Sequence, residues 1–154
     1  MIYNKGWSKM PAIIDRFMGK YWFLSNFYPA PVEMDGKLWP TVEHAYQACK
    51  TNDPVVRGRI LIAPKPGTAK YLGQRVRLRE NWDEMKLDVM KILVSRKFKE
   101  LELARKLLAT RDAQLVEGNY WGDAFWGVYN GAGENHLGRI LMEVRKELQR
   151  EAKP

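Results

Sequence analysis

The stretch at residues 39–50, WPTVEHAYQACK, constrains the fold more than any other part of the chain. Pro40 fixes one backbone angle, and Thr41 supplies a hydroxyl that can cap a helix. No helix breaker follows until residues 52–54, so the pattern predicts one helix of about three turns. At helical spacing one face is apolar, and the adjacent face carries Glu43, Tyr46, Gln47 and Lys50.

Glu43 is the candidate reactive group of this helix. It lies in the first turn, where the positive end of the helix dipole favours an ionised carboxylate. An ionised Glu43 could act as a base or could stabilise positive charge. The alternative is an ordinary solvated helix face, on which neither Glu43 nor Lys50 has a chemical role.

The segment before this helix is predicted to contain short extended pieces. Strand-like runs flank Asp35 and Gly36, which form the favoured pair for a two-residue hairpin turn. Residues 13–17 and 21–24 also have strand-like composition. Residues 1–11 show no period and are predicted to be a loose or strand-like lead-in.

Later helices are predicted from their start signals. Asp53 precedes a proline, which predicts a short helix over residues 55–62, and Thr68 can cap another short helix. Asn81 has the spacing of a capping box and opens a long amphipathic helix whose apolar stripe belongs to the core. Asn135 can cap a last amphipathic helix.

These elements predict a mainly α protein with small β elements (α+β), in a single domain over residues 1–154. A chain of this length can bury a sizeable core without disulfides. Cys49 is the single cysteine, and the two histidines are too few to favour a structural zinc site. No apolar run is long enough for a signal peptide or a membrane span. We therefore expect a cytoplasmic protein without membrane contact, metal or cofactor.

The charge indicates anionic partners. The net charge is +8 and the isoelectric point is about 9.6, which suits nucleic acid, nucleotides or phosphorylated metabolites. Much of the excess lies between Lys65 and Arg111, where a solvated helix face and a phosphate-binding surface remain alternatives. Six tryptophans and seven tyrosines could stack on flat ligands, although core packing is the commoner use of such residues.

Further candidate residues lie in loops and at a helix start. Asn26 and Tyr28 lie in a polar and aromatic loop and could face a pocket, although Asn26 could instead support a turn. Trp82 lies at a predicted helix start, where it could project into a cleft or pack against the helix. Asp123 lies in a loop at residues 118–133, and is either a second reactive carboxylate or the centre of an Asx turn.

Five motifs together resemble the NADAR, or YbiA-like, family: FLSNFYP at residues 23–29, WPTVEHAYQACK at 39–50, WDEMK at 82–86, DAFWG at 123–127 and NHLGR at 135–139. The resemblance extends from about residue 14 to residue 148. It implies a mainly helical domain with small β elements and a metal-free N-glycosidase activity. Two substrate classes are associated with such proteins, namely ribosylamino-pyrimidine phosphates of riboflavin synthesis and ADP-ribose joined to guanine bases, which could be part of a nucleic acid.

The resemblance also implies site residues. The matching catalytic positions are Glu43, Trp82, Asp123 and Trp126. The implied supports are Asn26, Tyr28 and Lys50, and Tyr46 joins them as a substrate-binding candidate from the polar face of its helix.

Cleavage of a ribosyl C1–N bond builds positive charge on the ring, and the leaving nitrogen must be neutralised. Glu43 is predicted to stabilise that charge or to activate water, while Asp123 either assists it or holds a ribose hydroxyl; these roles could be exchanged. The two tryptophans could stack on the base, and Lys50 could receive phosphate. The alternative function is a non-catalytic nucleotide or nucleic-acid binding module.

Overall fold

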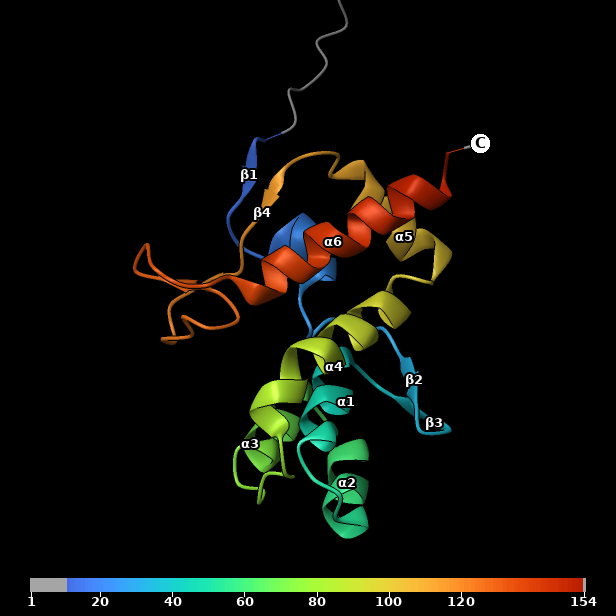
Figure 1. The fold of residues 1–154 in the computed structure, drawn as a ribbon, viewed down its shortest axis with the longest axis vertical. Helices are drawn as coiled ribbons and strands as arrows, with labels where there is room; N and C mark the ends of the chain where they lie inside the picture. The colour runs from blue at the N-terminus through green and yellow to red at the C-terminus, as the bar shows by residue number, and fades with distance from the viewer. Residues whose placement is uncertain (1–10, 154) are drawn as a thin grey trace, which may run out of the picture.

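The structure is a computed structural model that describes residues 11–153 (Figure 1), so the predicted lead-in lies outside the described residues except for its last position. The helices are η1 (Gly19–Leu24, a 3-10 helix), α1 (Val42–Cys49), α2 (Pro54–Leu61), α3 (Pro66–Gly73), α4 (Trp82–Lys97), α5 (Leu101–Ala109) and α6 (His136–Glu151). The strands are β1 (Ile13–Ile14), β2 (Val32–Met34), β3 (Lys37–Trp39), β4 (Gln114–Leu115), β5 (Gly118–Asn119) and β6 (Val128–Tyr129). The predicted mainly α class with small β elements is confirmed.

Three small two-stranded sheets join segments that are distant or adjacent in sequence. β1 pairs with β4 and β5 pairs with β6, both in parallel, whereas β2 and β3 form the predicted antiparallel hairpin. Asp35 and Gly36 at its turn both have positive φ angles, 52° and 71°. A two-residue hairpin turn of this type requires such angles, which explains the sequence signal.

Helix α1 lies at the centre of one half of the molecule (Figure 1), where it packs against α2, α3 and α4. Every residue from Val42 to Ala48 is buried. The helix has eight residues, so it is shorter than predicted, with about two turns. Helix α4 also packs against α6, which contacts α5 and β4 in the other half. The α1 face that was predicted to be polar therefore lies inside the protein.

Helix starts differ from the predictions in three places, at α3, α4 and α6. Proline at the first position starts α3 at Pro66, so Thr68 is not its cap. Asn81 has a left-handed backbone, with φ of 59°, and makes no side-chain cap, so the predicted capping box is wrong. The long helix ends at Lys97, and the Glu100 carboxylate caps a separate α5 by accepting hydrogen bonds from two backbone N–H groups.

Asn135 also fails to cap its helix. Its φ is 53°, and its side chain makes no cap bond to α6. Instead, its Oδ1 accepts from the N–H of Glu117 at 3.0 Å and its Nδ2 donates to the carbonyl of Leu115 at 2.9 Å. Asn135 therefore fixes the loop beside α6 rather than the helix itself.

The predicted strand at residues 21–24 is also wrong, because these residues belong to η1. Phe23 and Leu24 are adjacent and both buried, whereas a strand with one exposed face would bury only one of the two. Among the described residues, no helix combines the length and the apolar character needed to cross a membrane.

Candidate active site

A cavity of about 540 Å³ lies between α1, α3, α4 and the loop that follows β4. Three carboxylates line it, from Glu43, Glu117 and Asp123, and we call it the carboxylate cavity. The ammonium groups of Lys50 and Lys70 also line it. Its other walls include Asn26, Phe27, Tyr46, Gln47, Tyr120, Trp121 and Trp126.

Glu43 is held on α1 with only 7% of its surface exposed. Its N–H donates to the carbonyl of Asn26 at 3.1 Å, and Gln47 Nε2 donates to its Oε1 at 2.6 Å. Burial raises the pKa of Glu43, while the Gln47 hydrogen bond and the charges of Lys70 and Lys50 lower it. The solvated-face alternative is therefore wrong, and the predicted effect of the helix dipole is outweighed by desolvation.

Lys50 is half-buried at the end of α1. Burial lowers the pKa of Lys50, and the Glu43 carboxylate opposes this shift. Its Nζ lies 5.4 Å from the centroid of the Tyr46 ring. Lys70 on α3, which was not predicted as a site residue, adds a second ammonium group to the same cavity.

Asp123 forms the Asx turn that was one of its two predicted roles. Its Oδ1 accepts hydrogen bonds from the N–H groups of Phe125 at 3.1 Å and Trp126 at 2.8 Å. Asn119 holds the same turn, since it donates to the carbonyl of Asp123 and accepts from its N–H. Asp123 nevertheless lines the cavity, so its Oδ2 is the oxygen that can face a ligand.

Glu117 is a carboxylate of the cavity that was not predicted from the sequence. The residue is partly exposed, but its Oε2 is buried and has no hydrogen-bond partner among the described residues. Burial raises the pKa of Glu117 to about 8, and the Asp123 and Glu43 carboxylates act in the same direction. The sequence shows only a lone acidic residue at the end of a short strand-like run, residues 114–117, which is too weak a signal to select it.

The backbone of Glu117 is fixed by contacts from distant residues. Its carbonyl accepts from the N–H of Val128 at 2.9 Å, and its N–H is bonded to Asn135. A Cβ at Gly127 would lie 2.1 Å from the Glu117 carbonyl oxygen, so this position requires glycine. A Cβ at Gly138 would lie 2.4 Å from the Asn135 amide, which explains the glycine of the NHLGR motif.

The predicted aromatic residues are divided between the cavity surface and the layer behind it. Tyr46 and Trp126 line the cavity, with ring centroids 5.4 Å apart. Trp82 is buried behind Tyr46, with the two ring centroids 5.3 Å apart. It is not among the described residues that line the cavity. Tyr28 is likewise absent from this lining and packs edge-on against Trp22 at 5.0 Å.

Three buried side-chain oxygens have no hydrogen-bond partner among residues 11–153, and all three belong to residues of this cavity: Asn26 Oδ1, Gln47 Oε1 and Glu117 Oε2. Buried polar atoms are normally paired, because an unpaired one costs about 1–3 kcal/mol. Their concentration at one place indicates a surface built to receive the polar groups of a ligand.

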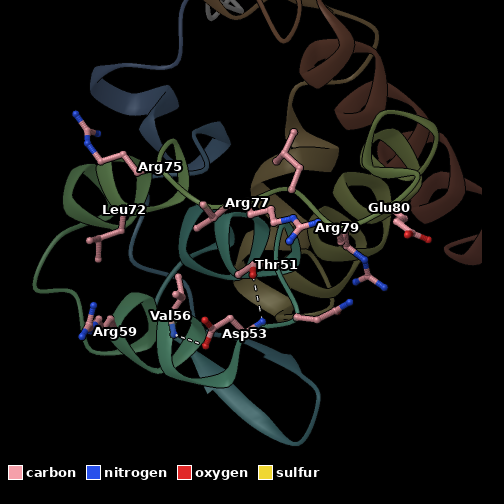
Figure 2. A pocket seen from close by; sticks show the side chains of 12 residues that line it. Thr51, Asp53, Val56, Arg59, Leu72, Arg75, Arg77, Arg79 and Glu80 are labelled. Carbon is pink, nitrogen blue, oxygen red and sulfur yellow. Dashed lines mark hydrogen bonds between the residues drawn. The ribbon is translucent and has the colours of Figure 1, made fainter.

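A second hollow, of about 830 Å³, lies beside the C-terminal ends of α1 and α3 (Figure 2). We call it the arginine cavity. It is lined by Arg59, Arg75, Arg77 and Arg79. Figure 2 shows these side chains spread around its edge rather than converging. None of the three unpaired oxygens lies here, and Asp53 is already engaged in capping α2. The other carboxylate of this lining, Glu80, is exposed, so the arginine cavity is a mainly cationic hollow without a buried carboxylate.

Within residues 11–153, no group of three or more His, Cys, Asp or Glu side chains is arranged to hold a metal ion. Glu43, Glu117 and Asp123 line one cavity without forming such a group.

Comparison with known proteins adds independent findings. The family model for the NADAR domain matches residues 15–149. The N-glycosidase YbiA of Escherichia coli is 42% identical over 132 residues, which cover 83% of this chain and 82% of that protein. An N-glycosidase of Nostoc punctiforme is 40% identical over 136 residues, with coverage of 84% and 86%.

A longer relative and a solved structure complete the comparison. A riboflavin biosynthesis protein of Vibrio vulnificus is 42% identical over 134 residues, but the match spans only 36% of that protein's length. The NMR structure of E. coli YbiA matches this chain with a TM-score of 0.80 and 38% identity, covering 93% of this chain and 89% of that one.

Proposed function

The chain belongs to the NADAR family, and on this premise we propose that it is an N-glycosidase that hydrolyses the C1–N bond of a phosphorylated N-riboside. The observation that carries the proposal is the carboxylate cavity, which combines three carboxylates, two ammonium groups and three unpaired buried oxygens. Relatives named N-glycosidase and riboflavin biosynthesis protein support the same reaction class.

Glu43 is assigned the central role in this chemistry. Departure of the nitrogen leaves an oxocarbenium-like sugar, and a carboxylate at its C1 stabilises the charge or accepts a proton from attacking water. The Gln47 amide orients Glu43 Oε1, and the two ammonium groups favour its ionised form. Glu43 is thus the best-supported base of the cavity.

The remaining side chains hold the substrate. Lys50 and Lys70 receive its phosphate, and Asp123 Oδ2 accepts a hydrogen bond from a ribose hydroxyl. Tyr46 and Trp126 cover the ring and exclude water, with Trp82 supporting Tyr46 from behind. Asn26 presents its unpaired Oδ1. The role proposed for Tyr28 is indirect, since it lies in the same loop as Asn26 and packs against Trp22.

Two substrate classes fit this arrangement, a ribosylamino-pyrimidine phosphate and an ADP-ribosylated guanine, the latter free or in a nucleic acid. Both present a ribosyl C1–N bond next to phosphate. The proposal includes a reaction without a metal ion and a cytoplasmic location. Activity that persists in a strong chelator is the expected test of the first point.

A second candidate function is a non-catalytic nucleotide or nucleic-acid binding module. The arginine cavity favours it, because its four guanidinium groups could contact phosphates away from the carboxylates. Under this alternative, substitution of Glu43 leaves binding unchanged, whereas charge reversal at several arginines abolishes it.

The test is release of the amino-pyrimidine and ribose phosphate from the first substrate class, and of ADP-ribose from ADP-ribosylated guanosine in the second, by the wild-type chain and by Glu43→Gln. We expect one class to be cleaved, and the variant to lose at least about 1000-fold in kcat while it still binds the substrate. The control Glu84→Gln changes an exposed carboxylate on α4 and keeps full activity. Binding of a substrate without cleavage by the wild type would refute the glycosidase and support the binding module.

A further inference from the structure

A third hollow adjoins the carboxylate cavity. Its volume is about 690 Å³, and its other walls come from η1, the turn before it, β5 and β6. It contains several aromatic rings, including those of Phe17 and Trp22, and we call it the aromatic cavity. The two hollows meet along five residues that line both: Ser25, Phe27, Glu117, Tyr120 and Trp121.

The two adjoining cavities differ in chemistry. The carboxylate cavity has two lysines, whereas the described lining of the aromatic cavity has none. Its charged residues other than Glu117 are Asp15 and Arg16, which pair with each other at 3.7 Å. Trp22 is 45% exposed, and a large aromatic residue left open in this way offers a stacking surface for a flat heterocycle.

Glu117 lies where these two environments meet. No described residue donates a hydrogen bond to its buried Oε2, and its backbone is held by Val128 and Asn135. Glu43, by contrast, has both a hydrogen-bond donor and two nearby ammonium groups. Burial raises the pKa of both carboxyl groups, but Glu43 has a donor and two ammonium groups that stabilise its carboxylate, whereas Glu117, with a pKa of about 8, is mostly protonated at neutral pH.

We infer that the aromatic cavity binds the nitrogen heterocycle that leaves the sugar, and that Glu117 donates the proton to its departing nitrogen. This inference rests on the proposed function and extends it, because it assigns the two halves of the substrate to two cavities. The sugar phosphate lies with Glu43, Lys50 and Lys70, and the C1–N bond lies beside Glu117.

The step balances as hydrolysis. The O–H bond of the Glu117 carboxyl breaks, and its proton goes to the leaving nitrogen, which keeps the electron pair of the C1–N bond. A water oxygen bonds to C1, and one proton of that water passes to the Glu43 carboxylate. Solvent then takes the proton from Glu43 and returns one to Glu117, so the products are a heterocyclic N–H and a sugar with a C1 hydroxyl.

The first test compares two leaving groups. One substrate is the N-riboside phosphate that the wild type cleaves, and the other is a para-nitrophenyl riboside phosphate, whose phenolate leaves without a proton. We expect Glu117→Gln to lower kcat by about 100-fold or more on the first and by less than about 5-fold on the second. The alkaline limb of the pH profile should disappear. Glu43→Gln lowers both rates, and Glu84→Gln lowers neither.

The second test separates the two cavities by inhibition with the free products. Trp22→Ala should weaken the binding of the free heterocycle by about 10-fold and leave the binding of ribose phosphate unchanged. Loss of one stacking ring lowers the affinity for a base by about that much. Lys50→Ala should weaken the binding of ribose phosphate and leave the binding of the heterocycle unchanged. Both inhibitors can also be titrated calorimetrically, so this test does not depend on turnover.

Distinct outcomes overturn the inference and the proposed function. If the wild type cleaves the N-riboside but Glu117→Gln slows both substrates equally, or neither, then Glu117 is not the proton donor and the glycosidase assignment stands. If Trp22→Ala weakens both inhibitors equally, the assignment of the aromatic cavity is wrong. If the wild type cleaves no N-riboside, the proposed function fails and the proton-donor role fails with it.

Discussion

The two walls of the carboxylate cavity surround their glutamates differently. On α1, burial raises the pKa of Glu43, but a hydrogen bond from Gln47 at 2.6 Å and the charges of Lys70 and Lys50 oppose this shift. On the facing loop, Glu117 Oε2 has no donor among the described residues, and neighbouring carboxylates favour its protonated form. Two similar groups can thus serve as base and acid because their surroundings differ.

The walls also differ in what builds them. The α1 wall is local, because the Thr41 cap and the helical spacing place Glu43 and Gln47 one turn apart. The loop wall is assembled from distant contacts, because Asn135 and Gly127 hold the Glu117 backbone. Substitutions far from Glu117 in sequence should therefore damage the loop wall, whereas α1 should respond mainly to changes in its own first turn.

The largest expected effect comes from Gly127→Ala. The added Cβ would lie 2.1 Å from the carbonyl oxygen of Glu117, and a backbone atom cannot move aside easily. We expect a loss of about 3 kcal/mol in the free energy of unfolding, measured by denaturant melts, together with loss of activity. Gly58→Ala is the matched control, since nothing lies near its Cβ and the residue is helical. That control should be neutral or stabilising by up to about 1 kcal/mol.

Much of the α1 wall could be predicted from sequence, but the loop wall could not. Thr41, Glu43 and Lys50 follow from capping and from helical spacing, which are local rules. Glu117 depends on contacts with Val128 and Asn135, and no local pattern shows which loop carboxylate will meet them. The burial of the α1 polar face was also not predictable, since it results from packing against three other helices.

Asn135→Ala should have the next largest effect. The change removes the hydrogen bonds to the Glu117 N–H and to the Leu115 carbonyl, and leaves both backbone groups without this partner. Asn81→Ala is the matched control, because Asn81 has a similar positive φ and precedes a helix without a side-chain cap. We expect Asn135→Ala to cost about 2.5 kcal/mol more than Asn81→Ala in chemical denaturation. Equal costs would mean that only backbone strain matters and that Asn135 does not support the loop wall.

Thr41→Ala should act on the other wall with a somewhat smaller effect. The Thr41 hydroxyl accepts from the N–H of His44 at 3.2 Å and lies 2.8 Å from His44 Nδ1. Since His44 Nε2 lies 3.0 Å from the carbonyl of Ala63, we assign the ring proton to Nε2 and a hydroxyl donor to Nδ1. Thr41→Ala should lower the free energy of unfolding by about 2 kcal/mol, whereas Thr41→Ser should retain most of the stability. A Ser variant as unstable as the Ala variant would show that the methyl group, rather than the hydroxyl, supports α1.

The smallest predicted effect is a pH dependence that tests the difference between the walls directly. In the folded chain burial raises the pKa of Glu117 to about 8, against an ordinary value of 4.5. Between these values the folded state binds more protons than the unfolded state, so this group's contribution to stability falls as pH rises. Glutamine cannot titrate. The free energy of unfolding of Glu117→Gln should therefore rise relative to that of the wild type by about 1 kcal/mol between about pH 5.5 and 6.5. Burial lowers the pKa of Lys97 to about 7, and this group titrates in both proteins, so its contribution cancels when the two denaturation curves are subtracted. The Glu43 carboxylate interacts with Glu117, so the difference reports the two glutamates together. A constant difference over this range would mean that Glu117 ionises like an exposed carboxylate, and the two walls would then no longer divide acid from base.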